Sequence, residues 1–177
     1  HSGDLSLLLA GPETGATALL RGRPDSTGLV QLALREPALR IHYAQGPLAG
    51  LGDANLDGIP DRISAAREAA LATLRLCDRL GLGAPADDGD GELDIYLIPL
   101  GGLARGYASV EGSLPPGRGG YGFVVADPSP HLDEHSFRAI VARSVARLVL
   151  ASRDASAPSW WTEASALWIE ERANGTS

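Results

Sequence analysis

The stretch "DEHSFRAIVARSVARLVLA", residues 133–151, predicts a long amphipathic helix around which the rest of the chain is arranged. Its apolar residues recur at intervals of three and four, which places them on one helix face. The expected buried stripe consists of Phe137, Ile140, Val141, Val145, Leu148 and Val149. A helix with one apolar face has to bury it against other elements, so the chain should form a layered domain.

Two more helices and five strands are expected around this helix. A helix from about 60 to 80 has Ile63, Ala66, Ala70, Leu74 and Cys77 on one face, and a last helix covers about 159 to 172. The strands are "GLVQLAL" (28–34), "LRIHYA" (39–44), "LDIYLIPL" (93–100), "GYASV" (106–110) and "GYGFVVAD" (120–127). These elements predict one α+β domain, 1–177, with a small mixed or antiparallel sheet packed with about three main helices. Residues 1–27 read as an irregular N-terminal segment and 28–177 as the core.

Composition excludes several classes of protein. The 177 residues carry a net charge of -7, and the 15 basic residues, all arginine, do not cluster as a nucleic-acid surface would require. We expect no membrane span, because no apolar stretch is long enough. The chain has no methionine, so we expect it to have been processed or to be a fragment, and its single cysteine is compatible with export.

The loop "DANLDGIPDR", residues 53–62, predicts a calcium site. Asp53, Asn55, Asp57 and Asp61 alternate around Gly58, and oxygen ligands spaced in this way can converge on one ion. The Ile59 carbonyl would be a further ligand. Ser64 stands where an EF-hand has its bidentate glutamate, so the loop is not a complete EF-hand.

A polar turn leading into the helix explains the same loop without a metal, because Asp, Asn and Gly are ordinary turn residues. We favour calcium, since three carboxylates within nine residues would repel one another without a cation. A second acidic stretch, "DDGDGELD" at 87–94, is less regular and is expected to be a solvated turn, although it could supply a further ligand or a second site.

The order of these segments resembles a family of bacterial secreted zinc metallopeptidases of the gluzincin type. The resemblance runs from about residue 39 onward, through "LRIHYAQGPLAGLGDANLDGIPDRI", "DGELDIYLIPL", the amphipathic helix and "WWTEASALWIEE". Its most specific element is the pattern formed by Trp160, Glu163, Ala166 and Trp168. The resemblance implies a metallopeptidase-like fold with a zinc site between the last two helices.

In such enzymes an H-E-x-x-H helix supplies two histidine ligands and a glutamate base, and the next helix supplies a third ligand. The matching segment here is "RSVAR", with Arg143 and Arg147 at the histidine positions and Ser144 at the glutamate position. Only Glu163, at the third-ligand position, remains. Because a guanidinium has no lone pair for a metal, we do not expect zinc here. We expect Arg143 and Arg147 to form an ion pair with Glu163, the alternative being that both arginines extend to water.

A competing zinc motif precedes this segment. "HLDEH" has the H-x-x-E-H form of inverted zinc motifs, with His131, Glu134 and His135 as its members. It lies at the expected start of the helix, where His131 need not be helical.

Our leading expectation is therefore a secreted, calcium-binding and catalytically inactive metallopeptidase-like domain with a structural, assembly or binding role. Its partner would be an unidentified protein or a second copy. The alternatives are an active zinc metallopeptidase using "HLDEH" and a glycan or peptide binding module. Trp160, Trp161 and Trp168 could form a binding platform, but we expect them in the core with Leu167 and Ile169. His42 and Cys77 are expected to be packed side chains, the latter an inert thiol.

Overall fold

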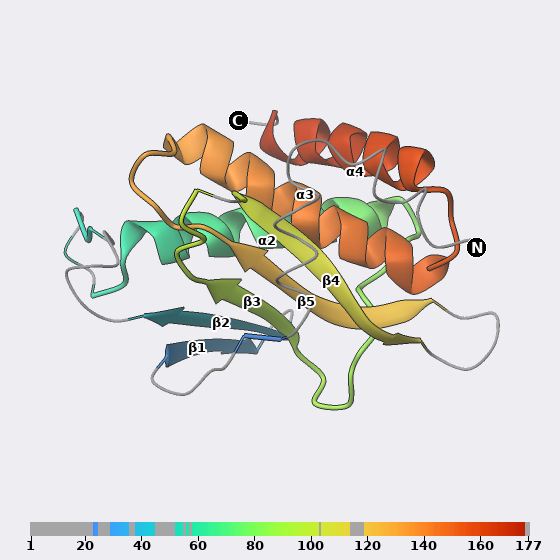
Figure 1. Ribbon diagram of the computed structural model, residues 1–177, viewed down its shortest axis with the longest axis horizontal. Helices are drawn as coiled ribbons and strands as arrows, with labels where there is room; N and C mark the ends of the chain where they lie inside the picture. Colours follow the sequence, from blue (N-terminus) through green and yellow to red (C-terminus); the bar gives the residue numbers. More distant parts are fainter. Residues whose placement is uncertain are drawn as a thin grey trace.

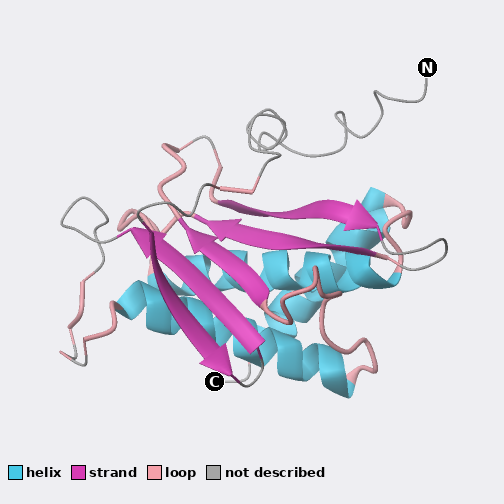
Figure 2. Ribbon diagram, turned by 90° about the horizontal axis from the view of Figure 1, so that it is seen from below, coloured by secondary structure: helices cyan, strands magenta, loops and turns pink. Residues whose placement is uncertain are grey.

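A computed structural model describes residues 23–24, 29–35, 38–44, 52–54, 56, 58–102, 104–113 and 119–175. They form one five-stranded sheet and three helices (Figure 1). The helices all lie on one face of the sheet, as the view from the strand side shows (Figure 2). The predicted α+β class with a small mixed sheet is confirmed. Most of the N-terminal segment 1–27 lies outside the described residues.

Every helix and strand that the sequence predicts is present, with ends that differ by a few residues. The elements are β1 (Leu29–Arg35), β2 (Ala38–Ala44), α2 (Asp61–Arg79), β3 (Leu93–Leu97), β4 (Gly106–Ser113), β5 (Gly120–Ala126), α3 (Glu134–Arg153) and α4 (Ser159–Asn174). β3 is shorter than expected, because Pro99 has no N–H to continue the ladder. β4 is longer, because it pairs with β5 up to Ser113.

The strand order is β1-β2-β3-β5-β4. β1 pairs antiparallel with β2, and β4 antiparallel with β5, while β3 is parallel to both β2 and β5. α2 makes the crossover between the parallel strands β2 and β3. This order leaves β4 at one edge of the sheet, beside α3 (Figure 1).

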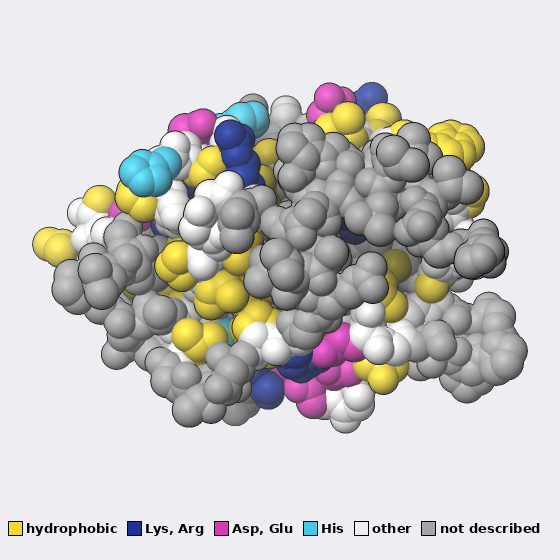
Figure 3. Space-filling model, viewed as in Figure 1, with side chains coloured by type: hydrophobic (Ala, Val, Ile, Leu, Met, Phe, Trp, Pro, Cys, Tyr) yellow, Lys and Arg dark blue, Asp and Glu magenta, His cyan; other side chains and the backbone are white. Residues whose placement is uncertain are grey.

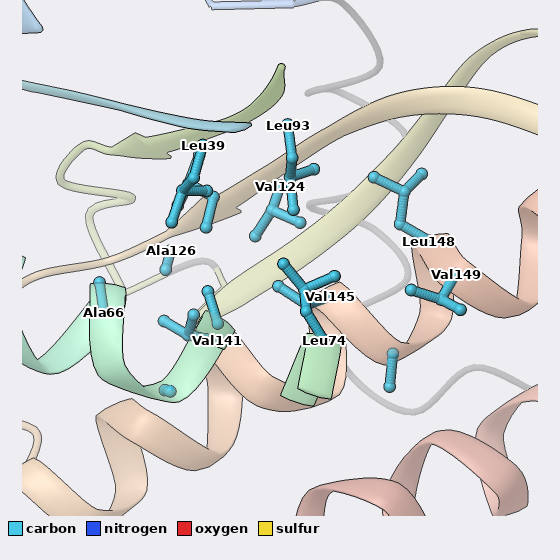
Figure 4. Packing of buried hydrophobic residues seen from close by; sticks show 14 of the residues in the cluster. Leu39, Ala66, Leu74, Leu93, Val124, Ala126, Val141, Val145, Leu148 and Val149 are labelled. Carbon is cyan, nitrogen blue, oxygen red and sulfur yellow. The ribbon is translucent and has the colours of Figure 1, made fainter. Parts of the chain in front are cut away.

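The main core lies between the sheet and the helix pair α2 and α3. Alternate strand residues point toward the helices, as expected for strands covered on that face. The packed side chains in Figure 4 are Leu39, Leu93, Val124 and Ala126 from the strands, Ala66 and Leu74 from α2, and Val141, Val145, Leu148 and Val149 from α3. The predicted stripe of α3 is confirmed, although Ile140 is only partly buried.

The prediction that the three tryptophans are core residues was wrong. Trp160 is 67% exposed and Trp161 and Trp168 nearly half exposed. The residues that α4 buries are Ala166, Ile169 and Glu170, spaced three and four apart, so the tryptophans fall outside that narrow stripe. Trp161 and Trp168 instead line an apolar hollow of about 420 Å³ together with Leu80 and Leu82, which follow α2.

His42 and Cys77 are both buried, as expected. Burial raises the pKa of the Cys77 thiol to about 11, so it stays protonated and unreactive at neutral pH. Across the described ranges, no helix combines the length and the apolar character needed to cross a membrane.

Candidate functional site

Both arginines of "RSVAR" reach from α3 to carboxylates on α4. Arg147 forms an ion pair with Glu163. Arg143 pairs with Glu170, with its Nε 2.7 Å and its Nη2 2.6 Å from the Glu170 Oε2. The position expected for zinc therefore holds two separate Arg–Glu pairs, each joining the two helices. We expected both arginines to pair with Glu163, but Arg143 pairs with Glu170. A spacing of seven residues puts both glutamates on one face of α4 and is the signal that indicates this second partner.

The two ion pairs differ in burial. The Glu170 side chain is 11% exposed, whereas that of Glu163 is 51% exposed. Exposed ion pairs contribute only about 0–1 kcal/mol each. The Arg147 Nε is also buried without a hydrogen-bond partner in the described part of the chain, which offsets some of this gain. The pair of Arg147 with Glu163 therefore contributes little to stability, while both pairs join α4 to α3.

A cleft lies between α3 and the start of β4. It encloses about 200 Å³ and is lined by Arg105, Gly106, Ser136, Ala139, Ile140, Arg143, Ser144 and Arg147. The strand approaches α3 closely here because Gly106 has no side chain. A Cβ on Gly106 would lie well under 3.0 Å from the Ile140 side chain.

The chemistry of this cleft differs from that of a zinc peptidase. Neither Arg143 nor Arg147 can ligate a metal, because the guanidinium stays protonated. The Ser144 side chain has no hydrogen-bond partner among the described residues, and no base lies beside it to activate its hydroxyl. Glu163 is thus the one conventional zinc ligand of the matched motif, and it is paired with Arg147.

The "HLDEH" residues lie at the beginning of α3. His131 is in the turn before the helix, and the Asp133 side chain caps the helix by accepting a hydrogen bond from the Ser136 N–H. Glu134 and His135 are exposed in the first turn, where Glu134 lies 3.6 Å from Arg138. In the described part of the chain, the one group of three potential metal ligands within 4.8 Å of one another is Asp87, Asp88 and Asp90. The structure does not bring His131, Glu134 and His135 together in this way.

The loop 53–62 is closed by its own hydrogen bonds. The Gly58 N–H donates to the Asp53 carboxylate, and the Ala54 N–H donates to the Asp61 carboxylate. The Asp61 N–H donates to the Gly52 carbonyl at 2.7 Å. Asn55 and Asp57 lie outside the described residues, and Ile59 is half-buried. The described contacts fit a polar turn that enters α2, and the calcium ligand set stays a prediction.

The second acidic stretch is paired with arginines across the sheet face away from the helices. Arg23 contacts Asp88, Asp94 and Glu111, and Arg40 contacts Asp90 and Glu92. Figure 3 shows acidic and arginine side chains gathered at the lower edge of that view. We expected a solvated turn here, and no local sequence pattern indicates the contacts that Arg23, Arg40 and Glu111 make.

Asp87 differs from its neighbours, because backbone N–H groups of Gly89 and Gly91 hold its carboxylate and lower its pKa. The acidic side chains of this loop are therefore held by arginines and by the backbone, without a metal being required.

Asp94, at the end of this acidic stretch, forms a buried pair with His42 of the neighbouring strand β2. The His42 Nε2 lies 2.7 Å from the Asp94 Oδ1, and its ring stacks on Tyr96 with centroids 4.3 Å apart. Burial favours a raised pKa for Asp94, but the hydrogen bond and charge of His42 and the charge of Arg23 outweigh it, so the Asp94 pKa is lowered. His42 therefore serves as a packed partner of Asp94.

Comparison of the chain with protein-family models, with curated proteins and with solved structures gives no match.

Proposed function

We propose that the chain is a catalytically inactive, metallopeptidase-like domain that acts by binding, in a secreted setting. The observation that carries the proposal is the pair of Arg–Glu contacts between α3 and α4, Arg143 with Glu170 and Arg147 with Glu163. They take up the helix positions at which the resembled enzymes hold zinc. A site with guanidinium groups at its two histidine positions cannot bind the metal that would polarise a peptide carbonyl or activate water.

The sequence resemblance and the arrangement of elements support this proposal together. A helix with the matched segment packs against a second helix that carries Glu163, and an edge strand, β4, runs beside the first helix. A cleft lies between that strand and helix. A cleft without the groups for hydrolysis fits a protein that holds a ligand and does not cleave it.

Restoring the motif tests the proposal. The triple variant Arg143→His, Ser144→Glu, Arg147→His places H-E-x-x-H on α3 and frees Glu163 as a third ligand. We expect this variant to bind one zinc ion per chain in equilibrium dialysis with atomic emission detection, and the original chain to bind none there.

The matched control carries the same three substitutions together with Glu163→Ala, which should weaken zinc binding about tenfold or more through the loss of one ligand. Stoichiometric zinc in the unaltered chain, removed by His131→Ala, would instead support the active peptidase that uses "HLDEH". Failure of the triple variant to bind zinc would contradict the metallopeptidase-like geometry.

Calcium binding in the loop 53–62 belongs to the same proposal and rests on the ligand pattern. We expect saturating calcium, compared with a chelator, to raise the melting temperature by roughly 5–10 °C, because an ion that binds only the folded state stabilises by mass action. Differential scanning fluorimetry measures this shift. Asp53→Asn should abolish it, whereas Asp87→Asn, a matched change in the other acidic loop, should leave it intact. If Asp87→Asn abolished the shift and Asp53→Asn left it intact, the ion would bind in the Asp87 loop and the proposed site would be refuted.

A further inference from the structure

The cleft between β4 and α3 carries a concentration of positive charge in an acidic protein. Three of its lining residues, Arg105, Arg143 and Arg147, are arginines, and none of the lining residues that the structure describes is acidic. Glu163 and Glu170 on α4 offset two of the three charges, so one positive charge remains uncompensated. The whole chain has a net charge of -7, which makes this local excess distinctive.

Arginine donors remain available for a ligand. Arg105 is exposed, and its side chain has no partner among the described residues. Arg143 directs its Nε and Nη2 to Glu170, which leaves its Nη1 without a partner in the same set of residues. The planar guanidinium presents several N–H groups in a fixed fork that matches a carboxylate or a phosphate.

Ser144 is a second, independent sign of a ligand. It lines the cleft from the middle of α3, is only 2% exposed, and has no hydrogen-bond partner among the described residues. Its oxygen is not one of the fully enclosed side-chain atoms without a partner, so the hydroxyl opens into the cleft and is available to a group placed there. An acceptor placed in the cleft would satisfy this hydroxyl.

The positions of these residues follow from helix geometry. Ser136, Ile140, Arg143, Ser144 and Arg147 recur at intervals of three and four, so they form one stripe along α3 facing the start of β4. The Ser136 hydroxyl is already bonded to Asp133 at 2.7 Å, which leaves Ser144 as the available hydroxyl of the stripe. The volume of about 200 Å³ is below the range of about 300–1,000 Å³ typical of pockets for drug-sized ligands. It suits a single charged group.

We infer that this cleft binds a small oxyanion, a carboxylate or a phosphate group, through the Arg105 and Arg143 guanidinium groups and the Ser144 hydroxyl. The inference rests on the proposed binding function and gives it a ligand chemistry. One α3 position that carries a histidine in the resembled zinc motif, that of Arg143, would then contribute to the anion site.

Two-dimensional NMR titration of the isotope-labelled chain tests the inference. The probes are inorganic phosphate, trialanine with its free carboxylate, and trialanine amide. We expect phosphate, trialanine or both to shift amide signals of α3 between 136 and 147 and of Gly106, and the amide to shift none of them. A response to phosphate alone assigns a phosphate ligand, and a response to trialanine assigns a carboxylate. The absence of a localised shift with either anion would overturn the inference.

Variants identify the groups that bind. Arg105→Gln should weaken the affinity for the anion about tenfold or more, since a hydrogen bond to a charged group is lost. Ser144→Ala should weaken binding without lowering the melting temperature, because its hydroxyl has no partner to lose; a purely structural serine would lower it. Arg138→Gln is the matched control, an arginine of α3 that pairs with Glu68 outside the cleft, and it should bind normally. Equal loss in all three variants, or in none, would refute the site.

A negative result in the titration and a negative result in the zinc experiment can be told apart. A triple variant that binds no zinc would contradict the metallopeptidase-like geometry while leaving the anion titration unchanged, because the titration involves no metal. A chain that binds neither anion would overturn the inference while leaving the zinc result as it stands.

Discussion

We expect Asp94→Asn to lower the free energy of unfolding by about 3–5 kcal/mol, because removing one partner of a buried ionic group leaves the others uncompensated. Asp94 is 2% exposed and lies between His42 and Arg23, with the Arg23 Nη1 2.5 Å from its Oδ2. The amide of asparagine keeps the size of the side chain but not its charge. Urea unfolding followed by circular dichroism measures the difference.

Asp90→Asn is the matched control, since Asp90 makes an exposed 3.2 Å contact with Arg40. It should cost less than about 1 kcal/mol. Equal effects of the two substitutions would contradict a central role for the buried pair of His42 and Asp94.

The same site predicts a dependence of stability on pH. The pKa of Asp94 is lower in the folded protein than its ordinary value. Its contribution is therefore fully present above about pH 4 and is lost as the pH falls through and below the ordinary aspartate range. Asp94→Asn should flatten the acid side of the stability profile, and an unchanged slope would argue against the lowered pKa.

The second large effect is expected from Gly122→Ala in β5. A Cβ at this position would lie well under 3.0 Å from the Ser109 carbonyl oxygen of the neighbouring strand β4. Backbone atoms cannot move aside as a side chain can, so the two strands would have to separate next to the irregular pairing between Val110 and Gly112. We expect a loss of about 3 kcal/mol or more, at the upper end of overpacking effects.

Gly112→Ala on the partner strand is the control for this clash. The three atoms nearest to a Cβ there all belong to the Tyr121 side chain, which is half-buried and can rotate. We expect a smaller loss of stability, measured by the same urea unfolding curves. A Gly112→Ala variant less stable than Gly122→Ala would contradict the reasoning from backbone contact.

Local patterns predicted the elements well, and the reason is physical. The spacing of Phe137, Val141, Val145 and Leu148 can be satisfied only by a helix with one buried face, and the structure buries all four side chains. The same holds for Ile63 to Cys77 in α2. The prediction for the tryptophans of α4 was wrong because their apolar character was taken as a sign of burial. The buried stripe of α4 consists instead of Ala166, Ile169 and Glu170, and the tryptophans lie outside it.

The candidate site was predicted only in part. Arg143, Arg147 and Glu163 were recognised from their positions relative to a motif, and spacing along a helix is enough to place the two arginines on one face. The pairing of Arg143 with Glu170 depends on how α4 lies along α3, and no local sequence pattern specifies this packing. Arg105 could not have been assigned to the cleft, because it lies outside α3 and reaches the cleft only through the pairing of β4 with β5.

By itself, then, the sequence determined the α+β class, the order of the elements and the absence of zinc-ligand residue types from "RSVAR", because these follow from the residues present and their periodicity. Only the tertiary structure decided which carboxylate each arginine pairs with, where Arg23 binds the acidic loop, and that a cleft with three arginines and a buried, unpaired serine lies against α3. These features join segments up to 88 residues apart, as Arg23 and Glu111 are. Their geometry depends on strand register and helix packing, which are set by the whole core at once.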